Sequence, residues 1–386
     1  METRNIEAHA MDLNQVRRIL VYRIGQLGDT IVALPAMWVV RRTFPNAYLA
    51  LLSDRHSESG YVCAEEVLPS KGLFDEYLSY DAGINGTDPR NPLTVLPVLR
   101  QRRFDTLVYL APRLRRHWQV CRDLLFFRLA GIQRFIGHKG FDSLPARAPG
   151  TELARVNHEA DHLLDRLAIS GIQVKTSDRG YMDLGLTRGE LLKAEKWLDA
   201  HRDDGCPGPV IAFGPGSKSP AKTWPIERYA MLGRRLIKEY NAFPMVFGGP
   251  RDRSLGEYLL TQWKCGVNAA GELSVRQAAP VIGLSQLYVG NDTGTMHLAT
   301  AVGTTCVVAF AALDWPGRWY PYGDQQMVLR RPVSCEGCMR SVCTDYGMAC
   351  MTEISVEDMW RACQRVLTRE TRQPMKSVLL QPSVKA

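Results

Sequence analysis

The sequence has no long apolar run, and this absence limits where the chain can reside. No stretch approaches the roughly 18 apolar residues that a bilayer-spanning helix requires. The segment from Met1 to Gln15 carries acidic side chains and no apolar core, so it does not read as a secretory signal. We therefore expect an irregular N-terminal tail and a cytoplasmic protein.

The glycine-rich segment near the N-terminus also lacks a feature, the third glycine of the dinucleotide-binding fingerprint. Gly25 and Gly28 stand in the segment Gly-Gln-Leu-Gly-Asp, and no glycine follows at the required offset. This argues against an NAD-dependent dehydrogenase.

Length and composition are those of a globular protein. A chain of 386 residues is too long for one ordinary core and suits two domains. Its hydrophobic content of 45% and charged content of 23% show no sign of disorder. The net charge of +8 favours anionic partners, and nucleic acid, a membrane surface and a phosphorylated substrate all qualify by charge alone.

Short apolar runs alternate with helical segments in two successive halves, which predicts an α/β protein with two parallel sheets. An apolar-periodic segment at 30–42 follows the first glycine-rich turn. The breaker-rich stretch at 203–209 is the expected linker. We expect Rossmann-like domains at 1–200 and 201–386, facing each other across a cleft. The expected strands are 17–23, 47–53, 106–111, 210–213, 242–247, 287–290 and 305–310.

Asp29 follows the first glycine-rich turn, at or next to the start of a helix. It admits two interpretations. As an N-cap it would satisfy free amide groups of the helix. As a carboxylate at the mouth of the cleft, it would be kept ionised by those amides and accept a proton.

The second motif is Asn291-Asp-Thr-Gly-Thr-Met-His297, at the end of an apolar strand. Asp292 or Thr293 can cap the following helix, and Gly294 permits a ligand to approach the backbone. The helix start is a suitable site for a diphosphate, with His297 on the same face as Thr293. A buried structural histidine is the alternative for His297.

Further polar loops follow two other strands of the second half. Gly214-Pro-Gly-Ser217 leads to Lys222, whose ammonium group suits a departing diphosphate, although a solvated surface lysine is the default. Gly248-Gly-Pro-Arg-Asp252 ends the next strand. Strand ends of one parallel sheet share an edge, so these loops are expected to converge.

Two other groups of residues suggest ligands. Arg113 and Arg115 are candidates for phosphates or carboxylates of an acceptor, and a solvated helix start is the alternative. Cys335, Cys338, Cys343 and Cys350 have a spacing that can bring four thiols to one structural zinc or iron ion. A second matching Cys-x2-Cys pair is missing, and reduced or paired cysteines are the alternative. For the chain as a whole, reduced cysteines are favoured over a disulfide framework.

Together these motifs resemble glycosyltransferase family 9, the ADP-heptose:lipopolysaccharide heptosyltransferases. The resemblance also includes Leu34-Pro-Ala36, Arg41-Arg-Thr-Phe-Pro45, Lys222-Thr-Trp-Pro225 and Trp319-Tyr-Pro321. It implies a GT-B fold, an inverting mechanism without a catalytic metal, and Asp29 as general base. It further implies that the donor contacts are Ser217, Lys222, Asp252, Asp292, Thr293, Gly294 and His297. Asp252 stands where the family often has glutamate.

The implied function is heptose transfer from ADP-heptose to an anionic, lipid-linked core acceptor, with no nucleic-acid partner. Peripheral association with the cytoplasmic face of the inner membrane is compatible with the basic charge. Two alternatives stay open. One is a related transferase that uses another nucleotide sugar on a glycan, protein or natural product. The other is a non-catalytic sugar-nucleotide-binding protein.

Overall fold

The structure is a computed structural model that describes residues 15–56, 60–82, 91–148, 150–202 and 205–370. Almost all of the expected N-terminal tail, and residues 203–204 of the expected linker, lie outside these ranges. In the described part no helix is long and apolar enough to cross a membrane.

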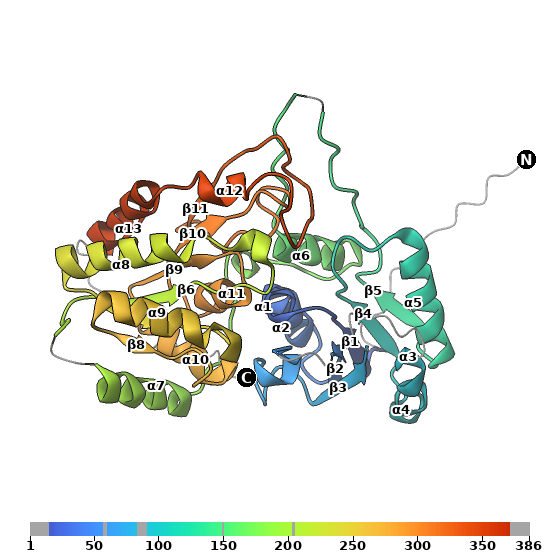
Figure 1. Cartoon of the computed structure of the whole chain (residues 1–386). Coiled ribbons are helices and arrows are strands. Elements are labelled where there is room, and N and C mark those ends of the chain that lie inside the picture. The colour runs from blue at the N-terminus through green and yellow to red at the C-terminus, as the bar shows by residue number, and fades with distance from the viewer. Residues whose placement is uncertain (1–14, 57–59, 83–90, 149, 203–204, 371–386) are drawn as a thin grey trace, which may run out of the picture.

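The chain forms two separate sheets in which every strand pairing is parallel (Figure 1). The first has the order β3-β2-β1-β4-β5, and the second has the order β11-β10-β9-β6-β7-β8. The strands of the first are β1 (Arg18–Tyr22), β2 (Tyr48–Arg55), β3 (Glu76–Asp81), β4 (Thr106–Tyr109) and β5 (Arg134–Ile136). Those of the second are β6 (Val210–Gly214), β7 (Phe243–Val246), β8 (Val267–Asn268), β9 (Leu287–Asn291), β10 (Cys306–Phe310) and β11 (Met327–Arg330).

Helices separate the strands, as the alternating pattern predicts. Those of the first half are α1 (Leu27–Val32), α2 (Leu34–Thr43), α3 (Asn91–Thr94), α4 (Leu96–Arg102), α5 (His117–Leu129) and α6 (Glu159–Ile169). The later ones are α7 (Arg188–His201), α8 (Ile226–Tyr240), α9 (Arg253–Trp263), α10 (Val275–Gly283), α11 (Gly294–Ala301), α12 (Ala349–Thr352) and α13 (Val356–Glu370). Short 3-10 turns η5 (Pro220–Lys222) and η6 (Pro250–Asp252) follow β6 and β7.

The predicted α/β fold with two doubly wound sheets is confirmed, and all seven expected strands are present. β3, β5, β8 and β11 were not predicted, because they are short or only partly buried and give weak patterns. The periodic segment 30–42 is divided between α1 and α2. Pro35 in the first turn of α2 has no N–H to donate, so it suits a new helix start better than a helix interior.

In each sheet the strand order reverses beside a central strand. The reversal lies between β1 and β4 in the first sheet, and between β6 and β9 in the second. Ligands of doubly wound sheets bind beyond the carboxyl ends of the strands at such positions. The division of the chain at residue 200 stays a prediction. Trp197 of α7 bonds Glu272, before α10, so α7 already packs on the second half.

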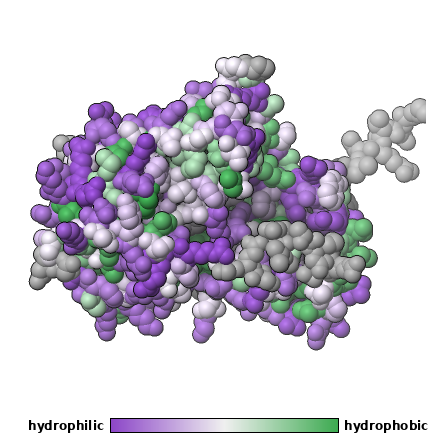
Figure 2. Space-filling view, in the orientation of Figure 1, coloured by the Kyte–Doolittle hydropathy of each residue, from purple (hydrophilic) through white to green (hydrophobic). Residues whose placement is uncertain are grey.

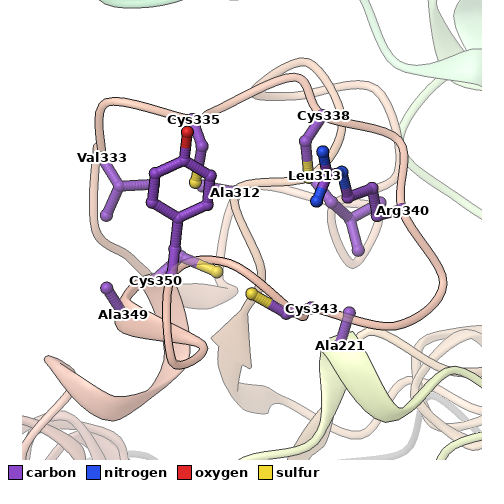
Figure 3. A pocket seen from close by; sticks show the side chains of 11 residues that line it. Ala221, Ala312, Leu313, Val333, Cys335, Cys338, Arg340, Cys343, Ala349 and Cys350 are labelled. Carbon is purple, nitrogen blue, oxygen red and sulfur yellow. The ribbon is translucent and has the colours of Figure 1, made fainter.

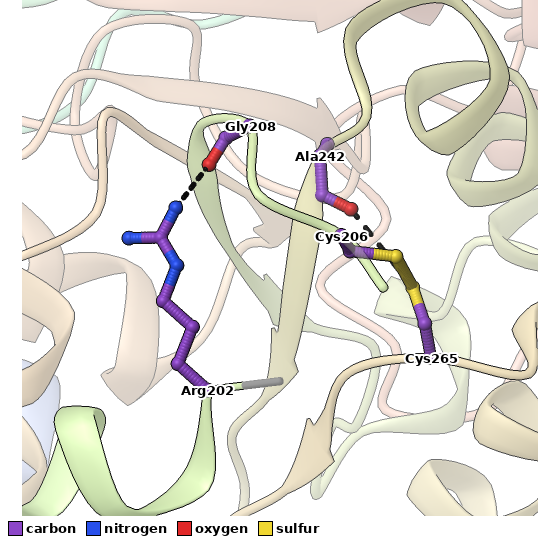
Figure 4. The surroundings of a disulfide bond; sticks show 5 residues. All are labelled: Arg202, Cys206, Gly208, Ala242 and Cys265. Carbon is purple, nitrogen blue, oxygen red and sulfur yellow. Dashed lines mark hydrogen bonds between the residues drawn. A yellow bond between two sulfur atoms is a disulfide. The ribbon is translucent and has the colours of Figure 1, made fainter. Parts of the chain in front are cut away.

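One disulfide, Cys206–Cys265, departs from the expectation of reduced cysteines, whereas the other eight cysteines are free thiols and form no disulfide framework (Figure 4). The two residues are 59 apart in the chain, yet their Cα atoms are 6.7 Å apart. Cys206 precedes β6 and Cys265 precedes β8, and both strands pair with β7 in parallel. Their amino ends therefore meet at one edge of the sheet, a proximity that sequence spacing does not reveal.

Candidate active site

Asp29 is the third residue of α1, the helix that follows β1. The N-cap residue of α1 is Gln26, so the interpretation of Asp29 as the N-cap is wrong. The Asp29 carboxylate nevertheless accepts the backbone N–H of Gln26 through Oδ2 at 3.0 Å. Its side chain is 22% exposed. The carboxylate is thus fixed by the helix start and still reachable from outside.

The backbone at Gly25 makes room for that carboxylate. Its φ is +121°, and a Cβ there would stand 2.6 Å from Cγ of Asp29, so only glycine fits. Both polar groups of this residue are held by β2 and the segment that follows it. Gly25 N–H donates to Asp54 at 2.9 Å, and the hydroxyl of Tyr61 donates to the Gly25 carbonyl at 2.8 Å. Sequence reasoning missed Asp54 and Tyr61, because neither lies in a glycine-rich motif.

Arg23, at the end of β1, is the charged partner of Asp29. Its guanidinium is 1% exposed and donates to the carbonyl of Leu110 at 2.7 Å and to Asp29 Oδ1 at 3.3 Å. Burial raises the pKa of Asp29 above its ordinary value, and this outweighs the lowering by Arg23 and the Gln26 N–H. The helix-start amide of Gln26 favours the ionised form, as expected, but its effect is smaller than those of burial and Arg23. A raised pKa brings a carboxylate closer to the range suited to a general base.

The starts of α1 and α11 interlock where the two halves meet (Figure 1). A Cβ on Gly28 would stand 2.8 Å from Cδ2 of His297. A Cβ on Gly294 would stand 2.8 Å from Cδ2 of Leu27. The space beside the Gly294 backbone, where we expected a ligand, is therefore occupied by the side chain of Leu27. The interlock places Asp29 beside the Asn291–Gly294 motif.

Lys222 and Asp292 form an ion pair at 2.6 Å between the loops after β6 and β9. Burial lowers the pKa of Lys222, but Asp292 more than offsets it, so the pKa lies above its ordinary value. Asp29 also contributes to this rise. Since that effect acts from the other half of the molecule, the predicted base and the predicted phosphate lysine share one electrostatic environment.

His297 is buried and neutral. Burial, with smaller effects of His158 and Lys222, lowers its pKa to about 3. Its Nδ1 is buried without a hydrogen-bond partner in the described part of the chain. The ring can offer a ligand a neutral hydrogen bond, whereas a cationic contact with phosphate is not available near neutral pH.

The other predicted donor residues lie on the same strand ends. Thr293 is the N-cap residue of α11, although its hydroxyl pairs with Thr295 at 2.9 Å and caps no amide. Ser217 accepts the N–H of Ser219 at 3.1 Å. Asp252 lies against the backbone of Gly216 and accepts the N–H of Gly249 at 2.9 Å. The loops after β6, β7 and β9 therefore converge, as predicted.

Asn291 holds these loops together, a role that the sequence analysis did not assign. Its Nδ2 donates to the carbonyl of Pro215 at 2.8 Å, and its Oδ1 accepts from Trp224 N–H and Tyr229 hydroxyl. A second link crosses between the halves, where Lys218 Nζ donates to Gln26 Oε1 at 2.7 Å. Asn291 and Lys218 lie in or next to the glycine-rich motifs of the sequence, but only the tertiary structure shows which segments they connect.

Arg113 and Arg115 differ in their surroundings, and neither is a solvated helix start. Arg115 donates to Asp123 at 2.5 Å and is held inside the first half. Arg113 is buried, its Nε has no hydrogen-bond partner among the described residues, and its backbone N–H donates to Glu159. Glu159 in turn pairs with Arg318 of the second half at 3.2 Å. Arg113 therefore retains donor capacity near the junction.

The four predicted metal-ligating cysteines line one small pocket of about 20 Å³, and their sulfur atoms turn into the space that the loop encloses (Figure 3). All four are free thiols. Within the described ranges, however, no three His, Cys, Asp or Glu side chains are arranged around a common metal position. Metal binding stays a prediction that would require these side chains to rotate.

The cysteine loop touches the lysine turn. The carbonyl of Ser341 accepts the N–H of Ala221 at 3.0 Å and the hydroxyl of Ser219 at 2.9 Å. Ala221 also lines the cysteine pocket. The loop therefore fixes the turn that presents Lys222.

Comparison with known proteins identifies the second half most directly. Residues 178–348 match the model of glycosyltransferase family 9 (heptosyltransferase), so the resemblance carried by the motifs is confirmed. Lipooligosaccharide heptosyltransferase 2 of Haemophilus influenzae is 31% identical over 128 residues, which are 32% of this chain and 36% of the relative. Lipopolysaccharide heptosyltransferase 2 of Salmonella typhimurium is 36% identical over 109 residues, 26% and 31% of the two chains. The chain thus spans about a third of the length of these relatives.

Solved structures agree with the fold over nearly the whole chain. A family 9 glycosyl transferase from Veillonella parvula superposes with a TM-score of 0.69 at 20% identity, covering 93% of this chain and 99% of that one. The ADP-heptose LPS heptosyltransferase II of Escherichia coli gives 0.63 at 20%, covering 92% and 99%. These similarities confirm the GT-B arrangement predicted from the sequence.

Proposed function

Since residues 178–348 match the model of glycosyltransferase family 9 (heptosyltransferase), we propose that the chain transfers heptose from ADP-heptose to an anionic, lipid-linked core acceptor. The observation that carries this proposal is the juxtaposition at the junction of the two halves. Asp29 from the first half raises the pKa of Lys222 in the second. Leu27 and Gly28, directly before Asp29, lie against Gly294 and His297, and Asp292 in the same motif pairs with Lys222. The proposed proton acceptor and the proposed diphosphate-binding cation would therefore face the same space. The sugar and the acceptor class come from the relatives, which are lipooligosaccharide and lipopolysaccharide heptosyltransferases.

In the proposed reaction an acceptor hydroxyl attacks the anomeric carbon of the donor. The new bond joins that oxygen to the sugar, the bond from the sugar to the diphosphate breaks, and ADP departs. Asp29 takes the hydroxyl proton. Attack opposite the leaving group inverts the anomeric centre.

Charge develops on the departing diphosphate, and the second half supplies groups to stabilise it. Lys222 keeps its positive charge because its pKa is raised. The free amides at the start of α11 add their dipoles on the same side. Preorganised charge of this kind is the main way an active site lowers such a barrier. Ser217, Asp252 and His297 would complete the donor site with neutral or carboxylate contacts.

The acceptor would enter from the first half. Arg113 has a buried Nε without a hydrogen-bond partner among the described residues, and its backbone N–H donates to Glu159 at the junction. Arg115 would act indirectly, because its guanidinium is already bound by Asp123. We propose peripheral attachment of the protein to the membrane that carries the acceptor.

The test is a thermal-shift screen against ADP-heptose and against ADP-, GDP- and UDP-hexoses, followed by mass spectrometry of acceptor products. We expect selective stabilisation by ADP-heptose and a product one heptose heavier. Stabilisation by another nucleotide sugar instead would show that this sugar, and not ADP-heptose, is the donor. Indifference to every nucleotide would contradict a transferase role. Binding without transfer to any acceptor would favour a sugar-nucleotide-binding protein.

A further inference from the structure

Helix α5 exposes a row of large apolar side chains on the outside of the first half. Trp118, Leu125 and Leu129 are 57%, 59% and 55% exposed. Spacings of seven and four residues place them on one side of a helix. Leu114, just before α5, is half exposed as well. Single exposed apolar residues are ordinary, but a row of them along one helix face marks an interaction surface.

A basic pocket adjoins the end of this face. Arg100, Arg103 and Arg134 line an open pocket of about 510 Å³ that Leu129 also borders. The one carboxylate in its lining is Asp105, whose Oδ2 already accepts the N–H groups of Arg17 and Arg18. The pocket is therefore cationic and suits an anionic headgroup phosphate. On the face shown in Figure 2, hydrophobic and hydrophilic residues are interspersed.

Positively charged side chains lie along α5 next to its exposed apolar residues. Arg116, Arg122 and Arg128 belong to or adjoin α5, and the guanidinium of Arg122 lies 5.5 Å from the ring centre of Trp118. Exposed tryptophan and leucine side chains flanked by arginines are typical of surfaces that lie in a membrane interface. At 13 residues, α5 is too short to span a bilayer.

We propose that the α5 face, defined as Leu114, Trp118, Leu125 and Leu129, docks on a bilayer that contains anionic lipid, with a lipid phosphate in the Arg100–Arg103–Arg134 pocket. The apolar side chains enter the interface and the arginines bind phosphates at its surface. α5 begins four residues after Arg113, so docking also brings the acceptor side of the junction to the membrane. The inference deepens the proposed function, since it rests on a lipid-linked acceptor, but its test needs no transfer reaction.

The test is co-sedimentation of the full chain with vesicles of phosphatidylcholine alone and of phosphatidylcholine with phosphatidylglycerol. We expect binding to the anionic vesicles that weakens as salt is raised, and little binding to the neutral ones. Arg100→Gln with Arg103→Gln should weaken anionic-vesicle binding by about 25-fold, at about fivefold for each arginine. Leu125→Gln with Leu129→Gln should weaken it by about tenfold or more.

Matched controls change the same residue types elsewhere on the surface. Arg253→Gln with Arg361→Gln removes two exposed charges from α9 and α13. Leu192→Gln with Met231→Gln removes two exposed apolar side chains from α7 and α8. Both controls should bind vesicles like the unmodified chain.

Three outcomes would overturn the proposal. These are equal binding to both vesicle types, equal loss in the control variants, and unchanged vesicle binding in the leucine variant. If that last variant instead converts a dimer to a monomer in light scattering, the α5 face is a contact between two copies of the chain. Because vesicle binding is measured without donor, a chain that docks but transfers nothing refutes the proposed function alone.

Discussion

Gly28 of α1 lies directly against the imidazole of His297 of α11, with only 2.8 Å between the position of a Cβ and Cδ2 of the ring. This contact joins the two halves next to both the predicted base and the predicted diphosphate site. Any side chain at position 28 must displace His297 or separate α1 from α11.

We expect Gly28→Ala to lower the free energy of unfolding by about 1–3 kcal/mol, the usual range for overpacking, and to weaken ADP binding. Denaturant unfolding and calorimetry measure the two effects. Gly189→Ala is the control, since a Cβ there meets nothing closer than 4.0 Å. His297→Ala in the Gly28→Ala background should restore stability by removing the clash. Additive losses in the double variant would contradict the contact.

Asp29→Ala should lower kcat by about 10²–10⁴-fold, because loss of a general base typically costs that much. Binding of ADP should change little, since the donor groups are on the other half. Single-turnover kinetics and calorimetry with ADP separate the two effects. Glu353→Ala, an exposed carboxylate before α13, is the control. Near-normal turnover in the Asp29 variant would remove this residue from the proposed role.

The pH dependence of kcat/KM should show an acidic limb above the ordinary aspartate pKa of about 3.9. Asp29 acts only when ionised, and burial raises its pKa, so activity falls as the pH drops through that raised value. No basic limb should arise from Lys222, whose pKa is raised. His297, with a pKa of about 3, stays neutral throughout.

Arg23 opposes the rise in the pKa of Asp29, so Arg23→Lys should move the acidic limb to still higher pH. Lysine cannot bond both Leu110 and Asp29 as the guanidinium does. Unfolding monitored over the same pH range shows whether the variant stays folded. An acidic limb at or below pH 3.9 in the unmodified protein would contradict both the assignment of Asp29 and its raised pKa.

Lys222→Met should weaken ADP binding and also lower stability by roughly 1–3 kcal/mol, because it leaves the buried Asp292 carboxylate without its partner. Adding Asp292→Asn removes the unpaired charge. The double variant should therefore regain stability but not ADP affinity. Recovery of both would show that Lys222 serves the structure and not the donor.

If the cysteine loop binds a metal, the purified protein should contain about one zinc or iron ion per chain, since four thiolates complete one site. Elemental analysis measures the content, and Cys343→Ser should abolish it. Cys121→Ser, an exposed cysteine of α5, is the control. Removal of the metal should also weaken ADP binding, because the loop carries the Ser341 carbonyl that holds the Lys222 turn. Metal-free protein with full ADP affinity would contradict the prediction.

Local patterns were sufficient for the buried central strands and the strand-end motifs, but not for the short or partly buried strands β3, β5, β8 and β11. Buried strands such as β1 and β9 are continuous apolar runs, and the turns after them carry glycines because the backbone must turn tightly there. Parallel strands place their carboxyl ends at one edge, so the convergence of Ser217, Asp252 and Asp292 followed from the order of motifs alone.

The contacts between distant segments depended on the tertiary structure. Leu27 against Gly294, Lys218 on Gln26 and the Cys206–Cys265 bond join positions whose distances are set by packing and not by local periodicity. The sequence by itself determined which residue types stand at the strand ends. Only the folded chain decided their burial, and with it the raised pKa of Asp29 and the neutrality of His297, because desolvation depends on every segment packed around a group.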